Sequence, residues 1–347
     1  MRRPLVALGV IVLLLVAGTA AYVLGIGPLA PRIAARSVVF VAISRSADEA
    51  DAQEIEAIDL AAGTRDLFDA GGRITAMAVS PDRRSLYVAL DGGAVVLLDA
   101  TTGSPFGTVD LHGPTVVSLV PTADGRTLFA VAVTNVQSSV VPIDLATKKT
   151  ADPVTFPMTA GAAVISGDAL ILPLADPQRL QVAFIDVNTH AVTSRLTLPG
   201  GSSIAPAAFR ISGARTGIVA FDLPFARGGP GLRVYVITDP LHWSDVALSA
   251  PFPQGRGRQP IGIGLQATAS VDGTIHVCTT AGAAAQRYVV SSDLRSTSVG
   301  MTCGPLAGGD RILMATRDPA QLLVLDGRTG NTVRTLPLAG VPARLAQ

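Results

Sequence analysis

The side chains best suited to hold a ligand gather in one short stretch of the chain. They are Arg227, Arg233, Arg256, Arg258, His242 and Trp243. A guanidinium pairs with a carboxylate or a phosphate through two parallel hydrogen bonds, so the arginines predict an anionic ligand. The competing interpretation is that the arginines are scattered over solvated loops and that His242 and Trp243 pack at the edge of a sheet.

Histidine and glutamate, frequent participants in general acid–base catalysis, are rare and widely spaced here. The histidines are His112, His190, His242 and His276, and the glutamates are Glu49, Glu54 and Glu56. The sequence contains no GxSxG, Walker or HExxH motif. An enzyme is therefore not favoured, although it stays open, and no cofactor is expected.

The two cysteines, Cys278 and Cys303, allow several interpretations. An even count fits a disulfide if the compartment is oxidising, and two buried free thiols are the alternative. His276 precedes Cys278 by two residues and so shares its strand face, which adds a His/Cys/Cys metal site as a third possibility. Three ligands without CxxC spacing argue against that metal site.

The elements that carry these residues repeat along the chain. Short apolar strands end in an aspartate at Asp59, Asp99, Asp144, Asp186 and Asp326, and degenerate copies end at Thr238 and Ser291. The spacing averages about 44 residues, a period typical of β-propeller blades. The sequence therefore predicts an all-β, seven-bladed propeller of four-stranded antiparallel blades. Each repeated aspartate is expected to cap a turn rather than to bind metal.

Each predicted blade has four strands, named A to D from the axis outward. The chain enters at a B-like strand over 37–43, followed by strand C over 54–59 and strand D over 65–69. Residues 341–347 form a lone A strand that would complete the first blade and close the ring. The propeller domain is thus expected to span 37–347.

The predicted loops differ between the two faces of the ring. The A–B and C–D turns are short, whereas the longer irregular segments all belong to the B–C and D–A connections. These segments are 44–53, 134–139, 175–179, 222–231 and 250–260. Loops held by a rigid scaffold often carry binding sites, so this long-loop face is predicted to carry function, mainly around the fifth blade.

The segment SPDRRSLYVAL, residues 80–90, followed by a VxVIDxxTG-like run, resembles the YVTN family of seven-bladed propellers, which is related to NHL and WD40-type propellers. The resemblance covers 37–347. It implies a binding or scaffold module more often than an enzyme. The chain departs from the family pattern where Thr238 and Ser291 replace the strand C aspartate.

The N-terminus predicts a membrane anchor. Residues 5–31 carry no charge, and this segment is long enough for one transmembrane helix. Arg2 and Arg3 precede it and favour a cytoplasmic N-terminus. We expect an anchor over 1–27 and a linker over 28–36, with the propeller on the extracytoplasmic side. A cleaved signal peptide, with a small-residue site over 18–21, is the alternative.

Composition narrows the function. A net charge of +1 gives no indication of nucleic-acid binding, and 48% hydrophobic against 15% charged residues excludes a disordered chain. Only Lys148 and Lys149 are lysines, a bias that hints at a high-GC bacterial genome.

The favoured function is a membrane-anchored module that binds a protein or cell-envelope component. The alternatives are a lyase or lactonase-like hydrolase with a divalent metal in the channel, and a structural role beside a membrane protein.

Overall fold

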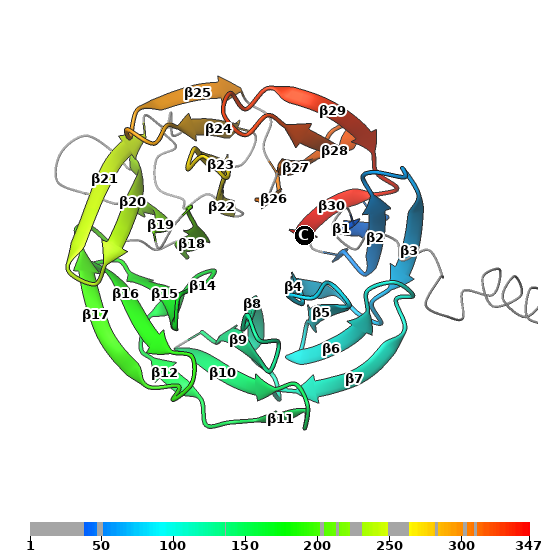
Figure 1. Cartoon of the computed structure of the whole chain (residues 1–347). Coiled ribbons are helices and arrows are strands. Elements are labelled where there is room, and N and C mark those ends of the chain that lie inside the picture. The colour runs from blue at the N-terminus through cyan, green and yellow to red at the C-terminus, as the bar shows by residue number, and fades with distance from the viewer. Residues whose placement is uncertain are drawn as a thin grey trace, which may run out of the picture. The chain divides into compact units, whose positions relative to one another are not determined.

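The computed structural model describes residues 38–46, 51–135, 137–201, 205–212, 215–222, 231–248, 264–281, 284–300, 304–308 and 311–347. Within these ranges thirty strands form seven antiparallel sheets. Figure 1 shows the sheets arranged as blades around a central opening. The predicted seven-bladed, all-β propeller is confirmed.

The first four blades, each given from the axis outward, follow the chain. Blade 1 holds β30 (Val341–Ala346), β1 (Val38–Ser44), β2 (Glu54–Asp59) and β3 (Arg65–Asp69). Blade 2 holds β4 (Ile74–Val79), β5 (Ser85–Leu90), β6 (Ala94–Asp99) and β7 (Pro105–Asp110). Blade 3 holds β8 (Thr115–Pro121), β9 (Thr127–Val133), β10 (Ser138–Asp144) and an outer strand in two pieces, β11 (Lys149–Thr150) and β12 (Val154–Phe156). Blade 4 has an inner strand in two pieces, β13 (Thr159–Ala160) and β14 (Val164–Ser166), then β15 (Ala169–Asp176), β16 (Arg179–Asp186) and β17 (Val192–Leu198).

The remaining three blades complete the ring. Blade 5 holds β18 (Ala207–Arg210), β19 (Thr216–Asp222), β20 (Gly231–Asp239) and β21 (His242–Leu248). Blade 6 holds β22 (Gly264–Ala269), β23 (Ile275–Ala281), β24 (Ala284–Val290) and β25 (Ser296–Gly300). Blade 7 holds β26 (Leu306–Ala307), β27 (Ile312–Arg317), β28 (Ala320–Leu325) and β29 (Thr332–Pro337).

Strands from both ends of the described chain share blade 1. β30 runs antiparallel to β1, with Phe40 opposite Ala346 and Ser44 opposite Val341, and Figure 1 shows the two strands side by side. The buried carboxylate of Glu56 strengthens this junction, because it accepts a 2.8 Å hydrogen bond from the Ala339 N–H. The N-terminal blade is therefore complete only when the C-terminal strand is in place.

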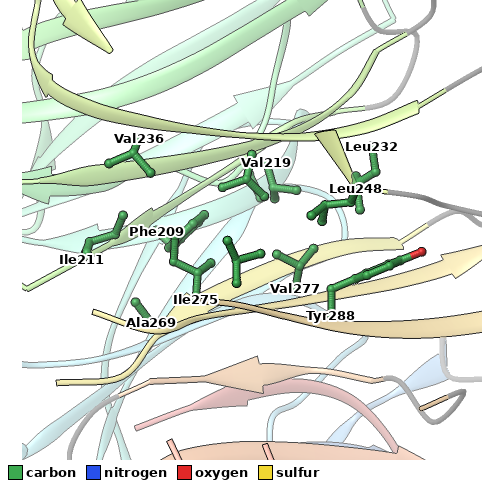
Figure 2. Packing of buried hydrophobic residues seen from close by; sticks show 13 residues of the cluster. Phe209, Ile211, Val219, Leu232, Val236, Leu248, Ala269, Ile275, Val277 and Tyr288 are labelled. Atoms are coloured by element: carbon green, nitrogen blue, oxygen red, sulfur yellow. The ribbon is translucent and has the colours of Figure 1, made fainter. Parts of the chain in front are cut away.

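The core lies between the blades. Each blade is covered on both faces, so the middle strands are buried almost throughout, as in β9, whereas the outer strand β17 alternates between partly buried and exposed residues. Figure 2 shows one such layer, in which Val219 and Leu232 of blade 5 pack on Val277 of blade 6. Burial of these faces fixes the register of each strand.

The repeated aspartates cap the C–D turns, as predicted. Asp59 accepts the N–H of Ala61 at 2.8 Å, and Asp186 accepts the N–H of Thr189 at 2.7 Å. The same arrangement holds at Asp99, Asp144 and Asp326. These hydrogen bonds favour the ionised carboxylate, and the backbone N–H of Thr189 is the main cause that lowers the pKa of Asp186.

Two local expectations are wrong, in blades 5 and 4. β20 ends at Asp239, not at Thr238, because a bulge between Ile237 and Asp239 moves the cap by one residue, and Asp239 accepts the Leu241 N–H at 2.8 Å. In blade 6 the expected departure holds, because Ser291 follows β24 in place of the aspartate and donates its hydroxyl to Asp293. Residues 175–179 form a tight hairpin rather than an irregular loop, because Asp176 caps it by accepting the Gln178 N–H at 2.8 Å.

The expected anchor over 1–27 and linker over 28–36 lie outside the described residues. In the described part of the chain, no helix has the length and apolar character needed to cross a membrane.

Candidate functional site

The ligand-binding residues predicted in blade 5 are only partly described. Arg227, Arg256 and Arg258 lie outside the described residues. Arg233, on β20, forms an ion pair with Asp245 on β21. The two residues are diagonal neighbours across the strand pair, since Arg233 lies opposite Ala247, two residues beyond Asp245. Arg233 thus already has an anionic partner within its own blade.

His242 and Trp243 lie at the other end of the same strand pair. The His242 ring is 2.8 Å from the carboxylate of Asp239 in the C–D turn. Trp243 packs edge-on against Tyr235, with ring centroids 5.7 Å apart. Arg233 and Asp239 are six positions apart along β20, which is roughly 20 Å of extended strand. The structure therefore does not bring Arg233 and His242 into one site.

A cavity lies on the axis of the ring. Its volume is about 430 Å³, and its walls come from the innermost strands β4, β8, β18, β22, β26 and β30 and, in blade 4, from Gly161 and Ala162 between β13 and β14. The lining is mostly apolar and includes Met77, Val117 and Leu265. This volume falls within the range of small-molecule binding sites, about 300–1,000 Å³.

The polar groups of this axial cavity also tie neighbouring blades together. Ser118 accepts the N–H of Ala163 at 3.2 Å, across the junction of blades 3 and 4. The side-chain oxygen of Gln266 accepts the N–H of Leu306 at 2.9 Å, across the junction of blades 6 and 7. The inner ends of the blades are thus held by side chains as well as by apolar packing.

Arg344 gives the axial cavity its charge. It is exposed, and none of the described residues that line the cavity carries a carboxylate. Apolar walls with one guanidinium suit a ligand that has an apolar body and a single anionic group.

A second cavity, of about 310 Å³, lies between blades 2 and 3 at the A–B turns. Asp82 and Asp124 line it, but each is engaged in its own turn. Asp82 accepts the Ser80 hydroxyl at 2.6 Å, and Asp124 accepts the Thr122 hydroxyl at 2.6 Å. These hydroxyl hydrogen bonds are the main cause that lowers the pKa of each aspartate, so both carboxylates are held ionised as turn caps.

Among the described residues, no group of three His, Cys, Asp or Glu side chains could hold a metal ion. His276 is fully buried, and its Nε2 lies 2.6 Å from the Gly327 carbonyl oxygen, to which it donates. Cys278 is disulfide-bonded, and Cys303 lies outside the described residues. A bonded sulfur has no thiolate to offer a metal, which removes the first of the proposed cysteine ligands.

Sequence reasoning raised an axial channel but identified neither the residues that line it nor the buried arginine Arg287. The cavity is lined by the inner edges of all seven blades, so no local motif encodes it. Arg287, in contrast, directly precedes the buried run Tyr288, Val289 and Val290 on β24, and a charged residue next to an apolar run is a signal that the sequence shows.

No protein-family model matches the chain, and the search of curated proteins found no match. Solved structures do match it. The dihydro-heme d1 dehydrogenase NirN in complex with DHE shares 14% identity with a TM-score of 0.54, over 90% of this chain and 75% of that chain. The RRP9 WD40 repeats share 13% identity with a TM-score of 0.56, over 79% and 83%. The β-propeller domain of Cps50 (Swd1) from Myceliophteria thermophila shares 15% identity with a TM-score of 0.52, over 78% and 87%.

Likeness at this level of identity shows the fold alone. The chain is a seven-bladed β-propeller that has WD40 propellers among its structural neighbours.

Proposed function

We propose that this propeller is a binding module, held at the extracytoplasmic side of a membrane. It recruits a protein or cell-envelope component through its long-loop face, which carries the B–C connections and is called the B–C face below. The proposal also places the chain among the YVTN-type propellers, on the resemblance of residues 80–90. The WD40 propellers among the structural neighbours support an interaction role.

The observation that carries this proposal is the uneven length of the B–C connections. In blade 1 the connection runs from Ser44 to Glu54 and in blade 5 from Asp222 to Gly231, whereas in blade 4 it runs only from Asp176 to Arg179. The C–D turns are more uniform and carry the repeated aspartate caps. A face on which loop length varies over a regular scaffold is where recognition is expected.

The base of the long blade 1 connection is well anchored. Arg45 Nε lies 2.7 Å from the carboxylate of Glu54, which joins the two ends of the connection. Within the connection, just before Glu54, the Ala52 carbonyl oxygen accepts the Ile74 N–H at 2.7 Å, which attaches the connection to blade 2. Blade 1 therefore adds a second candidate surface to the one predicted at blade 5.

Site-specific photo-cross-linking in the native envelope tests the proposal. A photoreactive residue replaces Arg45 on the B–C face, and the control replaces Arg126, an arginine that is also exposed and lies in an A–B turn on the opposite face. A discrete adduct from position 45 alone supports the binding module and identifies its partner by mass spectrometry. Equal adducts from both positions, or none from either, would contradict it.

Membrane attachment has its own test. The proposed anchor is residues 1–27, so the full chain should sediment with membranes after a carbonate wash, and a chain starting at residue 37 should not. Exchange of the anchor for an unrelated transmembrane helix should preserve partner recruitment. Loss of recruitment after this exchange would favour the structural role beside a membrane protein.

A further inference from the structure

The junction of blades 6 and 7 buries two basic side chains, Arg287 on β24 and His276 on β23. Figure 2 shows Val277 and Tyr288 of the same two strands in the layer shared with blade 5. Side chains alternate along a strand, so His276 and Arg287 lie on the opposite face of blade 6, toward blade 7. A hydrogen bond supports this placement, because the His276 Nε2 lies 2.6 Å from the Gly327 carbonyl oxygen of blade 7.

Arg287 is buried without a counter-ion among the described residues. Its side chain is only 8% exposed, and within the described chain its Nε and Nη1 have no hydrogen-bond partner. These two nitrogens carry three of the five N–H groups of a guanidinium. Burial lowers the pKa of Arg287, and no carboxylate opposes that effect. A buried charge without a partner is strongly unfavourable, so such groups are normally paired.

His276 is the second buried group whose hydrogen bonds are incomplete. Its side chain is fully buried, and its Nδ1 has no partner among the described residues. A carbonyl oxygen only accepts, so the Nε2 proton is directed to Gly327. The Nδ1 is then a lone pair in the neutral ring and an N–H donor in the protonated ring.

The two groups lie close together on one face of blade 6. His276 is the register partner of Val289 and Arg287 is the register partner of Cys278, so His276 and Arg287 are diagonal neighbours across the strand pair. Diagonal neighbours start about 7–8 Å apart, which is within reach of a long side chain. The pKa of His276 is lowered mainly by burial and also by the positive charge of Arg287, so the two groups lie within electrostatic range of each other.

The described surroundings supply no anion to Arg287. Asp272 and Asp326 act on His276 from the turns, where each accepts a backbone N–H of its own turn, and Arg328 acts on Asp272. Cys278 is disulfide-bonded and carries no charge. The buried blade 7 side chains that pack with Cys278 are all apolar: Leu306, Ile312, Met314 and Leu325. A negative partner for this junction therefore has to come from solution.

We propose that one small inorganic anion, of the size of chloride, binds between Arg287 and His276 at the junction of blades 6 and 7. Arg287 supplies the fixed positive charge and several N–H donors, and the protonated His276 ring adds a donor at Nδ1. A monoatomic ion fits better than sulfate or phosphate, because the apolar side chains of blade 7 offer no donors to further oxygens. Arg287 keeps 8% exposure, so the site is not sealed from solvent.

Thermal unfolding of the full chain tests the proposal. Sodium chloride replaces sodium gluconate stepwise at constant ionic strength, since gluconate is too large for the site. The melting temperature should rise by about 2–4 °C for each tenfold increase in chloride above the dissociation constant. Arg287→Met should not respond to chloride, and in gluconate it should melt at the same temperature or higher, because the unpaired charge is gone.

The control for loss of charge is Arg210→Met, at an exposed arginine on β18 of blade 5. This variant should respond to chloride as the unmodified chain does. An unmodified chain whose melting temperature is independent of chloride would overturn the proposal. An Arg287→Met chain with the same chloride response as the unmodified chain would overturn it as well.

The pH dependence of the chloride response gives a second readout that does not need Arg287→Met to fold. A bound anion favours the protonated His276 ring, so the chloride response should grow as the pH falls from about 8 to about 5.5. His276→Gln keeps an N–H for the Gly327 carbonyl but cannot titrate, so its chloride response should not change with pH. Equal pH dependence in both proteins would contradict a site shared by the two residues.

Bromide locates the ion directly, because it replaces chloride and scatters X-rays anomalously. In crystals of the full chain soaked in bromide, we expect an anomalous peak between Arg287 and His276. Bromide found only at the protein surface would overturn the proposal.

Discussion

The guanidinium of Arg344 donates a 2.9 Å hydrogen bond from Nε to the main-chain oxygen of Thr75. Arg344 lies on the last strand, β30, and Thr75 lies at a bulge in β4, the innermost strand of blade 2. The last strand therefore contacts blade 2 as well as its own blade, and it joins two blades at the axis.

Deletion of residues 341–347 should destabilise the whole ring. The deletion removes the antiparallel pairing with β1 and exposes the apolar edge of Val39 and Val41, which are fully buried. We expect a loss of several kcal/mol and a broadened transition in thermal unfolding followed by circular dichroism. Arg344→Ala, which keeps the strand, should cost only about 1 kcal/mol. A truncated chain that melts like the full chain would rule out closure by β30.

Packing between blades should dominate stability. Phe129→Ala, at a fully buried position on β9, should lower the free energy of unfolding by about 3–5 kcal/mol. Phe106→Ala is the matched control, since Phe106 is 47% exposed on the outer strand β7, and it should cost less than about 1 kcal/mol. Chemical denaturation measures both, and equal losses would show that the inter-blade layers are not the core.

Stability should fall in acid because the turn aspartates are held ionised. The pKa of Asp186 is lowered chiefly by the backbone N–H of Thr189 and then by the Thr189 hydroxyl. A carboxyl whose folded pKa lies below its unfolded value, about 3.9, stabilises the fold above that pH, and this stability is lost as the pH falls through the folded pKa.

Asp186→Asn keeps an acceptor oxygen but removes the titration. Melting temperature recorded between pH 7 and pH 2.5 should therefore decline less steeply for Asp186→Asn than for the unmodified chain. Asp66→Asn, at an exposed position on β3, is the control and should follow the unmodified chain. A slope that Asp186→Asn leaves unchanged would refute this role of the cap.

The axial cavity should bind an apolar anion. Anilinonaphthalene sulfonate combines an aromatic body with one sulfonate, so it should bind near 1:1 with enhanced fluorescence. Ala267→Trp fills the cavity and should abolish this binding, and Arg344→Gln should weaken it about tenfold. Arg126→Gln, in an A–B turn outside the axial cavity, is the charge-loss control. Binding that survives Ala267→Trp would place the probe elsewhere.

The architecture was predictable because every blade repeats the same local sequence pattern. Apolar strands alternate with turns that begin at an aspartate, and Asp99 and Asp186 cap those turns as expected. Prediction from this local pattern fails in blade 5, because a bulge before Asp239 shifts the turn cap by one residue. A bulge depends on how a strand pairs with its neighbour, which the local sequence does not show.

The candidate sites were less predictable because they combine distant residues. Arg233 looks like an anion ligand in sequence, yet Asp245 on the neighbouring strand already neutralises it. Arg344 looks like part of an ordinary C-terminal tail, yet ring closure places it at the axis. Charge alone does not reveal which arginine is committed to an internal partner.

The pairing of β30 with β1 also sets the order in which the polypeptide can mature. About 300 residues separate Ser44 from Val341, and a ribosome that adds roughly 5–20 residues per second needs about 15–60 s to make them. Throughout that interval β1 has a free edge that can pair with another chain. The speed of translation, together with any chaperone that shields β1, therefore governs how many nascent chains become closed rings and how many aggregate.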